Sequence, residues 1–197
     1  MSIQHSSGSP VKDNLSWKEE SRKTVFSCPI FRVEESVCRS PDNSPKTFTV
    51  LDAADWAIVI PELNSGHGKK FIMVRQWRHG ARELSLEFPG GVFEKGEAPE
   101  AAAARELLEE TGYCAKKMER LGVFSPNPAI MSNRVHFFLA LDLEPPIAQE
   151  LDEDEYVEVE TVSLEEIIDG LGKPPYIHAL MGTAMALYLR KGIGDRE

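Results

Sequence analysis

The sequence lacks the features that mark secreted and membrane-bound proteins. Its three cysteines, Cys28, Cys38 and Cys114, are an odd number and form no CxxC pair, which argues against a disulfide framework. The first residues, MSIQHSSGSP, contain neither the basic nor the apolar segment of a signal peptide. No apolar run approaches the length that crosses a bilayer. We therefore expect a cytoplasmic protein that does not associate with membranes.

Basic residues are also scarce. The chain has 22 lysines and arginines against 32 aspartates and glutamates, a formal net charge of −10. This balance argues against a general nucleic-acid-binding protein, which needs a basic surface. It does not exclude a small phosphorylated substrate, because a metal ion and local arginines can outweigh the average charge. At 197 residues and 42% hydrophobic content, the chain can form one domain with a real core and a small appendage.

What the chain does contain is a glycine loop followed by a carboxylate-rich helix, in residues 91–113, GVFEKGEAPEAAAARELLEETGY. Pro99 suits a first helical turn, where its missing N–H costs nothing. The alanines and leucines that follow are strong helix formers. Gly112 can adopt the left-handed conformation that ends a helix. The pattern predicts a helix from Pro99 to Thr111.

Three carboxylates share one face of this predicted helix. Glu106, Glu109 and Glu110 are related by i, i+3 and i+4, so their side chains are neighbours. Like charges at this spacing repel, which suggests a compensating cation. Oxygen ligands suit Mg2+ or Mn2+, which keep several waters and bind together with substrate phosphates. The alternative is a solvated acidic face with no ligand.

The full spacing of the segment is more specific than its carboxylates alone. The pattern GX5EX7REUXEEXGU, where U is a bulky apolar residue, is matched by Gly91, Glu97, Arg105, Glu106, Leu107, Glu109, Glu110, Gly112 and Tyr113. The segment therefore resembles a Nudix box. The resemblance implies an α/β/α sandwich with a mixed sheet, in which Arg105 orients Glu97. It also implies that divalent ions are held by box glutamates and a carbonyl, with the candidates Glu106, Glu110, Glu109, Glu97 and Gly90.

The segment before the box narrows the resemblance. Arg75, Gln76, Trp77 and Arg78, with Glu87-Phe-Pro-Gly-Gly, resemble the VRQYR and E(L/F)PGG segments of ADP-ribose and nucleoside-diphosphate-sugar pyrophosphatases. By this resemblance Arg78 would bind the diphosphate or the terminal ribose, and Glu87 would contact the substrate. Arg75 is a weaker candidate of the same kind, because arginine suits bidentate phosphate contacts. Alternatively, these arginines only balance surface acid.

Candidates after the box come from two loops. Pro128 lies 16 positions past Gly112, the offset of a proline in the ADP-ribose branch, and Arg134 is a candidate for substrate contact or for a capped turn. An acidic run at 149–156 is a solvated loop by default. In ADP-ribose pyrophosphatases a glutamate of the equivalent loop is the general base, which points to Glu153 with Glu155 as the alternative. With Glu109 and Arg105 these complete the catalytic candidates.

The remaining elements follow from periodicity and turn signals. Residues 23–33 and 46–50 predict N-terminal strands separated by the turn SPDNSP. Further strands are predicted at 54–60, 71–75, 82–88, 118–124, 134–141 and 155–162, and helices at 163–169 and 175–191. We expect a disordered tail over 1–14, a β-subdomain over 15–50 and the Nudix domain over 51–197. The five histidines show no metal-ligand spacing.

The resemblance predicts Mg2+-dependent hydrolysis of ADP-ribose or a related nucleoside-diphosphate sugar to a nucleoside monophosphate and a sugar phosphate. It also implies a homodimer that exchanges its N-terminal strands, with an aromatic residue, Phe26, Phe31 or Phe48, stacked on the base. Three alternatives remain open. They are another Nudix hydrolase (of GDP-mannose, FAD, a dinucleoside polyphosphate or capped RNA), a ligand-binding Nudix domain without catalysis, and a scaffold, which would not explain the carboxylates.

Overall fold

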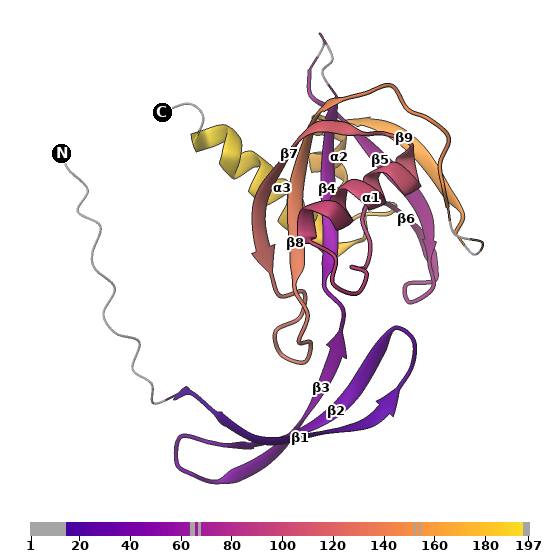
Figure 1. Cartoon of the computed structure of the whole chain (residues 1–197). Coiled ribbons are helices and arrows are strands. Elements are labelled where there is room, and N and C mark those ends of the chain that lie inside the picture. The colour runs from indigo at the N-terminus through magenta and orange to yellow at the C-terminus, as the bar shows by residue number, and fades with distance from the viewer. Residues whose placement is uncertain (1–14, 64–65, 67, 152, 154, 195–197) are drawn as a thin grey trace, which may run out of the picture. The chain divides into compact units, whose positions relative to one another are not determined.

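The computed structural model describes residues 15–63, 66, 68–151, 153 and 155–194 (Figure 1). The chain divides into two compact units. One unit consists of Met1–Ala53 with Pro128–Ser132, and the other of Ala54–Asn127 with Asn133–Glu197. The tail predicted over 1–14 lies outside the described residues.

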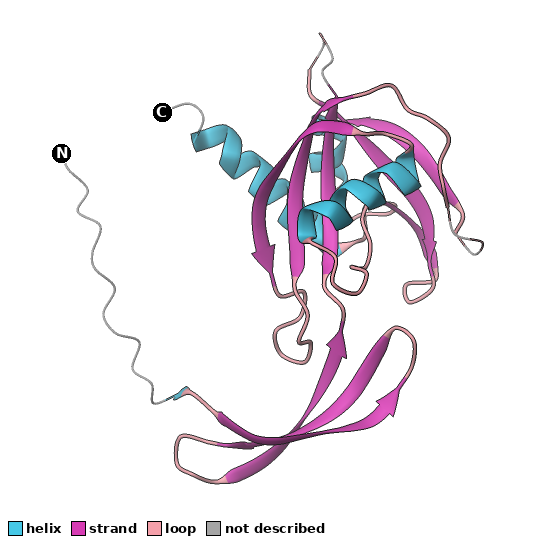
Figure 2. Ribbon diagram, viewed as in Figure 1, coloured by secondary structure: helices cyan, strands magenta, loops and turns pink. Residues whose placement is uncertain are grey.

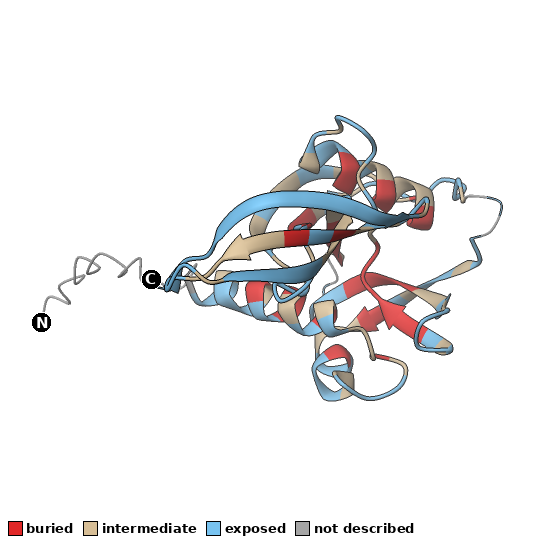
Figure 3. Cartoon of the chain, turned by 90° about the horizontal axis from the view of Figure 1, so that it is seen from below, coloured by how far each residue is buried: buried red, intermediate tan, exposed pale blue. Residues whose placement is uncertain are grey.

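The first unit is an antiparallel sheet of β1 (Lys18–Ser27), β2 (Phe31–Arg39) and β3 (Pro45–Ala53). The strands predicted within 23–33 and 46–50 are present, and the segment 23–33 spans the end of β1 and the start of β2. A turn interrupts this segment at Cys28, whose amide donates to the Phe31 carbonyl at 3.1 Å, because Pro29 cannot donate to a strand ladder. Residues 128–132 join the sheet beside β3, where the Leu51 amide donates to the carbonyl of Ile130 at 2.7 Å. In Figure 3 the outer strands of this sheet are mostly exposed.

The second unit is built on a mixed sheet with the strand order β6-β5-β4-β8-β7, and β9 pairs with the other side of β5. The strands are β4 (Trp56–Leu63), β5 (Lys70–Arg78), β6 (Glu83–Glu87), β7 (Ala115–Phe124), β8 (Val135–Leu143) and β9 (Val157–Ser163). Only β4 and β8 run parallel. The predicted strands are thus all present in this unit, but β6 begins after Arg82, whose φ of 59° belongs to a turn.

Helices cover both faces of this sheet (Figure 2). On one face α1 (Pro99–Thr111) packs Ala102, Ala103 and Leu107 against small and aromatic residues of β4 and β8. On the other face α2 (Leu164–Gly170) and α3 (Ala179–Gly194) enclose the larger core, which includes Phe71, Met73 and Phe137. The predicted α/β/α sandwich is confirmed. No helix of the described residues is long and apolar enough to cross a membrane.

The helix ends show where local signals decide the structure. α1 has the predicted bounds, and Gly112 ends it with a φ of 73° while its amide donates to the Leu108 carbonyl at 2.7 Å. The α2 cap is also as predicted, since the Ser163 hydroxyl accepts from the Glu166 amide at 3.1 Å. The predicted start of α3 at Pro175 is wrong. The carbonyl of Pro175 instead accepts from the Leu86 amide at the edge of β6.

Candidate active site

The carboxylate face of α1 is not a solvated surface. Glu106 and Glu110 are only 9% and 4% exposed, whereas the Glu109 side chain is 34% exposed. Both buried carboxylates face Gly90 and Gly91 at the start of the box. The Gly90 amide donates to Oε2 of Glu110 at 2.8 Å. The glycine segment and the helix therefore form one site, although the helix begins eight residues after Gly91.

Close approach requires glycine at Gly90, where the neighbour is backbone, and at Gly91 a side chain would displace the Glu106 carboxylate. A Cβ added at Gly91 would lie 2.5 Å from Oε1 of Glu106, and one at Gly90 would lie 2.1 Å from the carbonyl oxygen of Ala57. The carbonyls of the residues on either side of Gly90 accept hydrogen bonds from β4. The Val59 amide donates to the Pro89 carbonyl, and the Ala57 amide donates to the Gly91 carbonyl. The Gly90 amide, by contrast, points to Glu110, which leaves the Gly90 backbone beside the two buried carboxylates.

Arg105 connects the remaining box carboxylates. Its Nε donates to Glu97 at 3.0 Å, and its Nη1 donates to Glu106 at 2.9 Å and to Glu109 at 2.8 Å. Its Nη2 reaches the Val92 carbonyl at 3.1 Å. The pair of Arg105 with Glu97 that the resemblance implied is thus present, and the same guanidinium also holds two residues of its own helix. Its position fixes both the loop and the carboxylate face.

Burial makes these carboxylates hard to ionise in the metal-free protein. It raises the pKa of Glu106 to about 7, against an opposing effect of Arg105. Burial likewise raises the pKa of Glu110 to about 8, although the Gly90 amide acts in the opposite direction. The charges of Glu106 and Glu155 push the pKa of Glu110 further upward. A bound cation would favour the ionised form of both buried acids. The pair is therefore suited to hold one.

The donor set fits a divalent ion that takes few protein ligands. Among the described residues, no group of three His, Cys, Asp or Glu side chains is placed to enclose an ion. Mg2+ does not need such a cage, since it usually takes one or two carboxylates and completes its shell with water and phosphate. Glu106, Glu110 and the Gly90 carbonyl are the groups placed to hold it. Glu97 was also predicted as a metal ligand, but both of its oxygens are already hydrogen-bonded, to Arg105 and to the Glu94 amide.

A second cluster lies at the end of β5 and β6. Nε of Arg78 donates to Oε1 of Glu87 at 2.7 Å, and Nδ1 of His178 lies 2.8 Å from Oε2 of Glu87. Burial raises the pKa of Glu87, but the bonds from His178 and Arg78 outweigh it, so the net shift is downward. Glu87 was expected to contact the substrate. It is 1% exposed with both oxygens engaged, so here it holds Arg78 instead.

Arg75, the second arginine of the same segment, faces away from Arg78. It forms an ion pair with Glu160 of β9, which raises the pKa of the Arg75 guanidinium. Residues three apart on a strand point to opposite faces, so only one of the two arginines can reach the carboxylates. The charge of Arg78 does so, because it lowers the pKa of Glu110. The structure therefore brings Arg78, and not Arg75, to the box.

The other two predicted substrate contacts lie elsewhere. Arg134 donates from Nη1 to the Ser125 hydroxyl at 2.7 Å, and its amide donates to Asp55 at 2.7 Å. These bonds fit the capped turn that was the alternative for this residue. Pro128 belongs to the first unit, with residues 128–132. Its role in substrate binding stays a prediction.

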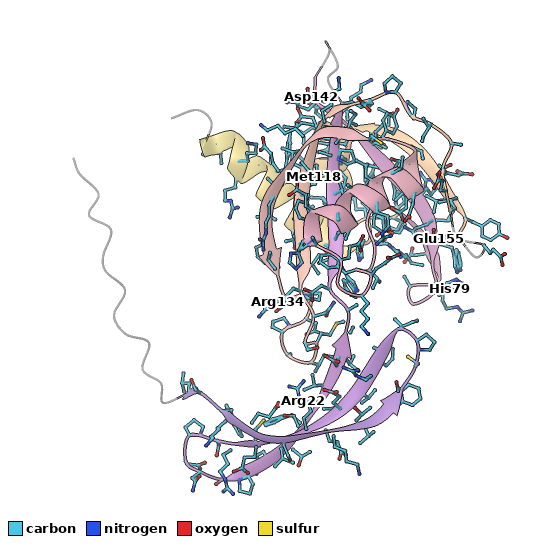
Figure 4. The ribbon with its side chains drawn as sticks, in the orientation of Figure 1. Arg22, His79, Met118, Arg134, Asp142 and Glu155 are labelled. Atoms are coloured by element: carbon cyan, nitrogen blue, oxygen red, sulfur yellow. The ribbon has the colours of Figure 1, made fainter. Side chains whose placement is uncertain are left out.

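The acidic loop, which follows β8, is hydrogen-bonded to the C-terminal end of α1. The Ile147 amide donates to the Gly112 carbonyl at 2.9 Å, and the Glu150 amide donates to the Glu109 carbonyl at 3.0 Å. The chain then continues to Glu155, which is labelled in Figure 4. The charge of Glu155 raises the pKa of both Glu106 and Glu110. The structure thus places Glu155 within electrostatic reach of the box. Both Glu153 and Glu155 are exposed, and Glu153 lies in a turn.

Comparison with known proteins agrees with this geometry. The model of the NUDIX domain matches residues 54–181. The chain belongs to the NUDIX domain family. It is 47% identical over 100 residues to an ADP-ribose pyrophosphatase of Bacillus subtilis, a match that covers 50% of this chain and 54% of that protein. It is 31% identical over 155 residues to a methanol dehydrogenase activator of Bacillus methanolicus, covering 77% of this chain and 82% of that protein.

The fold has a close structural counterpart. A crystal structure of an ADP compounds hydrolase superposes with a TM-score of 0.78 over 92% of this chain and 97% of the other, at 23% identity. The likeness at this identity concerns the fold alone. The match with the Bacillus subtilis protein spans about half of each chain. The expected family of this Nudix protein is thereby confirmed.

Two residues of interest were missed by the sequence reasoning. His178 was dismissed for its lack of metal-ligand spacing, yet it binds Glu87. Trp17 was not named among the aromatics, yet its ring packs edge-to-face on Phe48 at 5.1 Å, and both are about half exposed. Phe26 and Phe31 form a looser pair at 6.4 Å. A tryptophan before a run of β-formers was a visible signal for the second case, whereas nothing local pointed to the first.

Proposed function

We propose that this Nudix protein hydrolyses the diphosphate linkage of ADP-ribose or a related nucleoside-diphosphate sugar, with Mg2+ or Mn2+, to a nucleoside monophosphate and a sugar phosphate. The observation that carries the proposal is the pair of buried carboxylates, Glu106 and Glu110, beside the Gly90 backbone and within reach of the Arg78 charge. A relative named ADP-ribose pyrophosphatase supports the substrate class.

Different residues would hold the metal ions and bind the substrate. Glu106 and Glu110, with the Gly90 carbonyl, would hold the ions, and Arg105 would keep Glu106 and Glu109 in place. A bound divalent ion neutralises phosphate charge and lowers the pKa of water. The Nη groups of Arg78 would grip the diphosphate, since Nε is already used by Glu87.

We place the general base on the acidic loop and favour Glu155 over Glu153. The base must take a proton from a water near the phosphorus, within hydrogen-bond reach or through one more water. The influence of Glu155 on both Glu106 and Glu110 supports its nearness to that position. A carboxylate there would accept the proton of the attacking water and orient its lone pair.

A substrate panel tests the reaction. Purified protein with Mg2+ is incubated with ADP-ribose, GDP-mannose, ADP-glucose, NADH, FAD and diadenosine polyphosphates, and products are separated by chromatography. We expect AMP and ribose 5-phosphate from ADP-ribose, with turnover abolished by a chelator and restored by added Mg2+. Faster cleavage of another member would assign the protein to a different Nudix substrate. A folded sample that cleaves none of them would be a binding domain, and the proposal would fail.

We also propose that the protein is a cytoplasmic homodimer that associates through its N-terminal sheet. All ten residues of β1 are exposed, and the unit leaves Val25, Phe26 and Phe48 about half exposed. A small sheet with so little buried apolar surface needs a further packing partner. Sedimentation equilibrium should give twice the chain mass, and Phe26→Asp should shift it toward the monomer. A monomeric wild-type protein at micromolar concentration would contradict the dimer.

A further inference from the structure

The chain at the start of α3 is hydrogen-bonded to the residues on both sides of Glu87. The Leu86 amide donates to the Pro175 carbonyl at 3.0 Å, and the Phe88 amide donates to Sδ of Met181 at 3.1 Å. His178 lies between these two attachment points. Its backbone position is therefore set by the strand that carries Glu87.

The base of this segment is rigidly packed. Tyr176 is 5% exposed, and its hydroxyl donates to Glu166 of α2 at 2.9 Å. Its ring lies so close to Gly170 that a Cβ added there would come within 2.3 Å of it. Few alternative positions are open to the chain that follows. The approach of His178 to Glu87 is thus built by the fold and not by a flexible side chain alone.

The two oxygens of Glu87 are divided between two donors. Oε1 accepts from Nε of Arg78 at 2.7 Å, and Oε2 lies 2.8 Å from Nδ1 of His178. The downward shift of the Glu87 pKa means that this carboxylate is ionised at neutral pH, so Nδ1 of His178 carries the shared proton. A carboxylate held at one oxygen can still rotate, whereas one held at both cannot. His178 thereby fixes the direction in which Glu87 accepts from Arg78.

The orientation of Arg78 matters because its other nitrogens are available. Among the described residues, Nε is the one atom of the Arg78 side chain that makes a hydrogen bond, and the side chain is 41% exposed. A guanidinium is planar, so fixing Nε also fixes the direction of Nη1 and Nη2. Its charge acts on Glu110, which places it beside the proposed metal site. The free edge of Arg78 matches the paired oxygens of a diphosphate.

We propose that His178 is a positioning residue for diphosphate binding, which holds Glu87 so that Arg78 presents both Nη groups to the substrate phosphates. This inference rests on the proposed function, because the diphosphate is the group that Arg78 would meet. His178 itself touches neither the substrate nor the metal in this arrangement. It acts through two hydrogen bonds in series.

Three variants test the role in the full-length protein. His178→Ala removes the donor, while His178→Asn keeps an N–H at the same number of bonds from Cα as Nδ1. His79→Ala is the matched control, because His79 is exposed on the turn next to Arg78 (Figure 4). We expect His178→Ala to raise the KM for ADP-ribose about tenfold, since a hydrogen bond to a charged group is worth roughly that factor or more. The kcat should change less than about threefold, as for uniform binding.

His178→Asn should recover most of the loss, with a KM within about threefold of the wild-type value, and His79→Ala should leave KM unchanged. A double-mutant cycle separates positioning from general stability. Arg78→Ala should raise KM, and adding His178→Ala should raise it no further. An unchanged KM in His178→Ala, or an equal rise with and without Arg78, would overturn the proposal. Melting temperatures show which variants are folded at the assay temperature.

Failure of the proposed function has a different signature. If the wild-type protein cleaves none of the panel, the role of His178 is measured as the Kd of ADP in the presence of Mg2+, by calorimetry. His178→Ala should weaken this binding about tenfold and His178→Asn should restore it. Equal Kd values in the three proteins, or no binding of ADP to the wild type, would overturn the positioning role.

Discussion

Glu110→Gln should lose about 10²- to 10³-fold in kcat/KM while the protein stays folded, a loss similar to that from removing one strong electrostatic contact in an active site. Glutamine keeps the size of the side chain and can still accept from the Gly90 amide, which now donates to Oε2 at 2.8 Å. It removes the negative charge that would hold a divalent ion beside Glu106. Initial rates with ADP-ribose at saturating Mg2+ measure the loss.

The same substitution should stabilise the metal-free protein at high pH. The pKa of Glu110 is raised from 4.5 to about 8, so the folded state binds the proton more tightly than the unfolded state does. The buried charge therefore destabilises the wild-type protein as pH rises from about 4.5 through about 8, whereas glutamine carries no such charge. Without metal, the melting temperature of Glu110→Gln should exceed that of wild type by roughly 5 °C at pH 8, and by less at pH 5.

Added Mg2+ should reverse this order, because the ion stabilises only the protein that binds it. Glu100→Gln is the control, since Glu100 is an exposed residue of the first turn of the same helix. It should change neither the activity nor the response to Mg2+. If Glu110→Gln keeps more than about a tenth of the wild-type kcat/KM, Glu110 does not hold the metal.

Glu155→Gln should lower kcat by about 10²- to 10⁴-fold, the usual contribution of a general base. Glu153→Gln should leave kcat nearly unchanged. The two residues are chemically alike and two positions apart, so each controls for the other. The difference rests on the charge of Glu155, which acts on Glu106 and Glu110 in the structure. Single-turnover rates check the assignment, because loss of the base slows the chemical step itself.

The reverse result, with Glu153→Gln inactive and Glu155→Gln active, would restore the first expectation from the sequence. Loss in neither variant would move the base off this loop, with Glu109 as the remaining candidate. Its side chain is 34% exposed and is held by Arg105 at 2.8 Å. Substrate binding should survive in both variants, so the effect belongs in kcat.

Local signals predicted some elements to the residue. α1 has the expected bounds because Pro99 and Gly112 each act within one turn of the helix. The spacing of Glu106, Glu109 and Glu110 likewise places them on one face wherever the helix packs. Predictions from local sequence failed where a segment also pairs with a segment that is distant in the sequence. Cys28 and Pro29 sit among β-formers yet make a turn, and the Pro175 carbonyl bonds to β6 before α3 begins.

The arginines before the box show a signal that was available and unused. Arg75 and Arg78 are three residues apart on one strand, so the alternation of strand side chains already separates their faces. Which face carries the site depends on α1 packing against β4 and β8, and that follows from the whole sheet. No spacing could indicate His178, because 91 positions separate it from Glu87. Their contact exists only after α3 has packed beside β6.

By itself, the sequence determined that this chain has a Nudix box, a helix that carries three carboxylates and an acidic surface. These follow from backbone preferences and side-chain periodicity, which act over a few residues. The tertiary structure alone decided that Glu106 and Glu110 are buried against Gly90 and Gly91, and that their pKa values are raised. Burial depends on segments that are distant in sequence, and the removal of water from a carboxylate sets its affinity for protons and for metal.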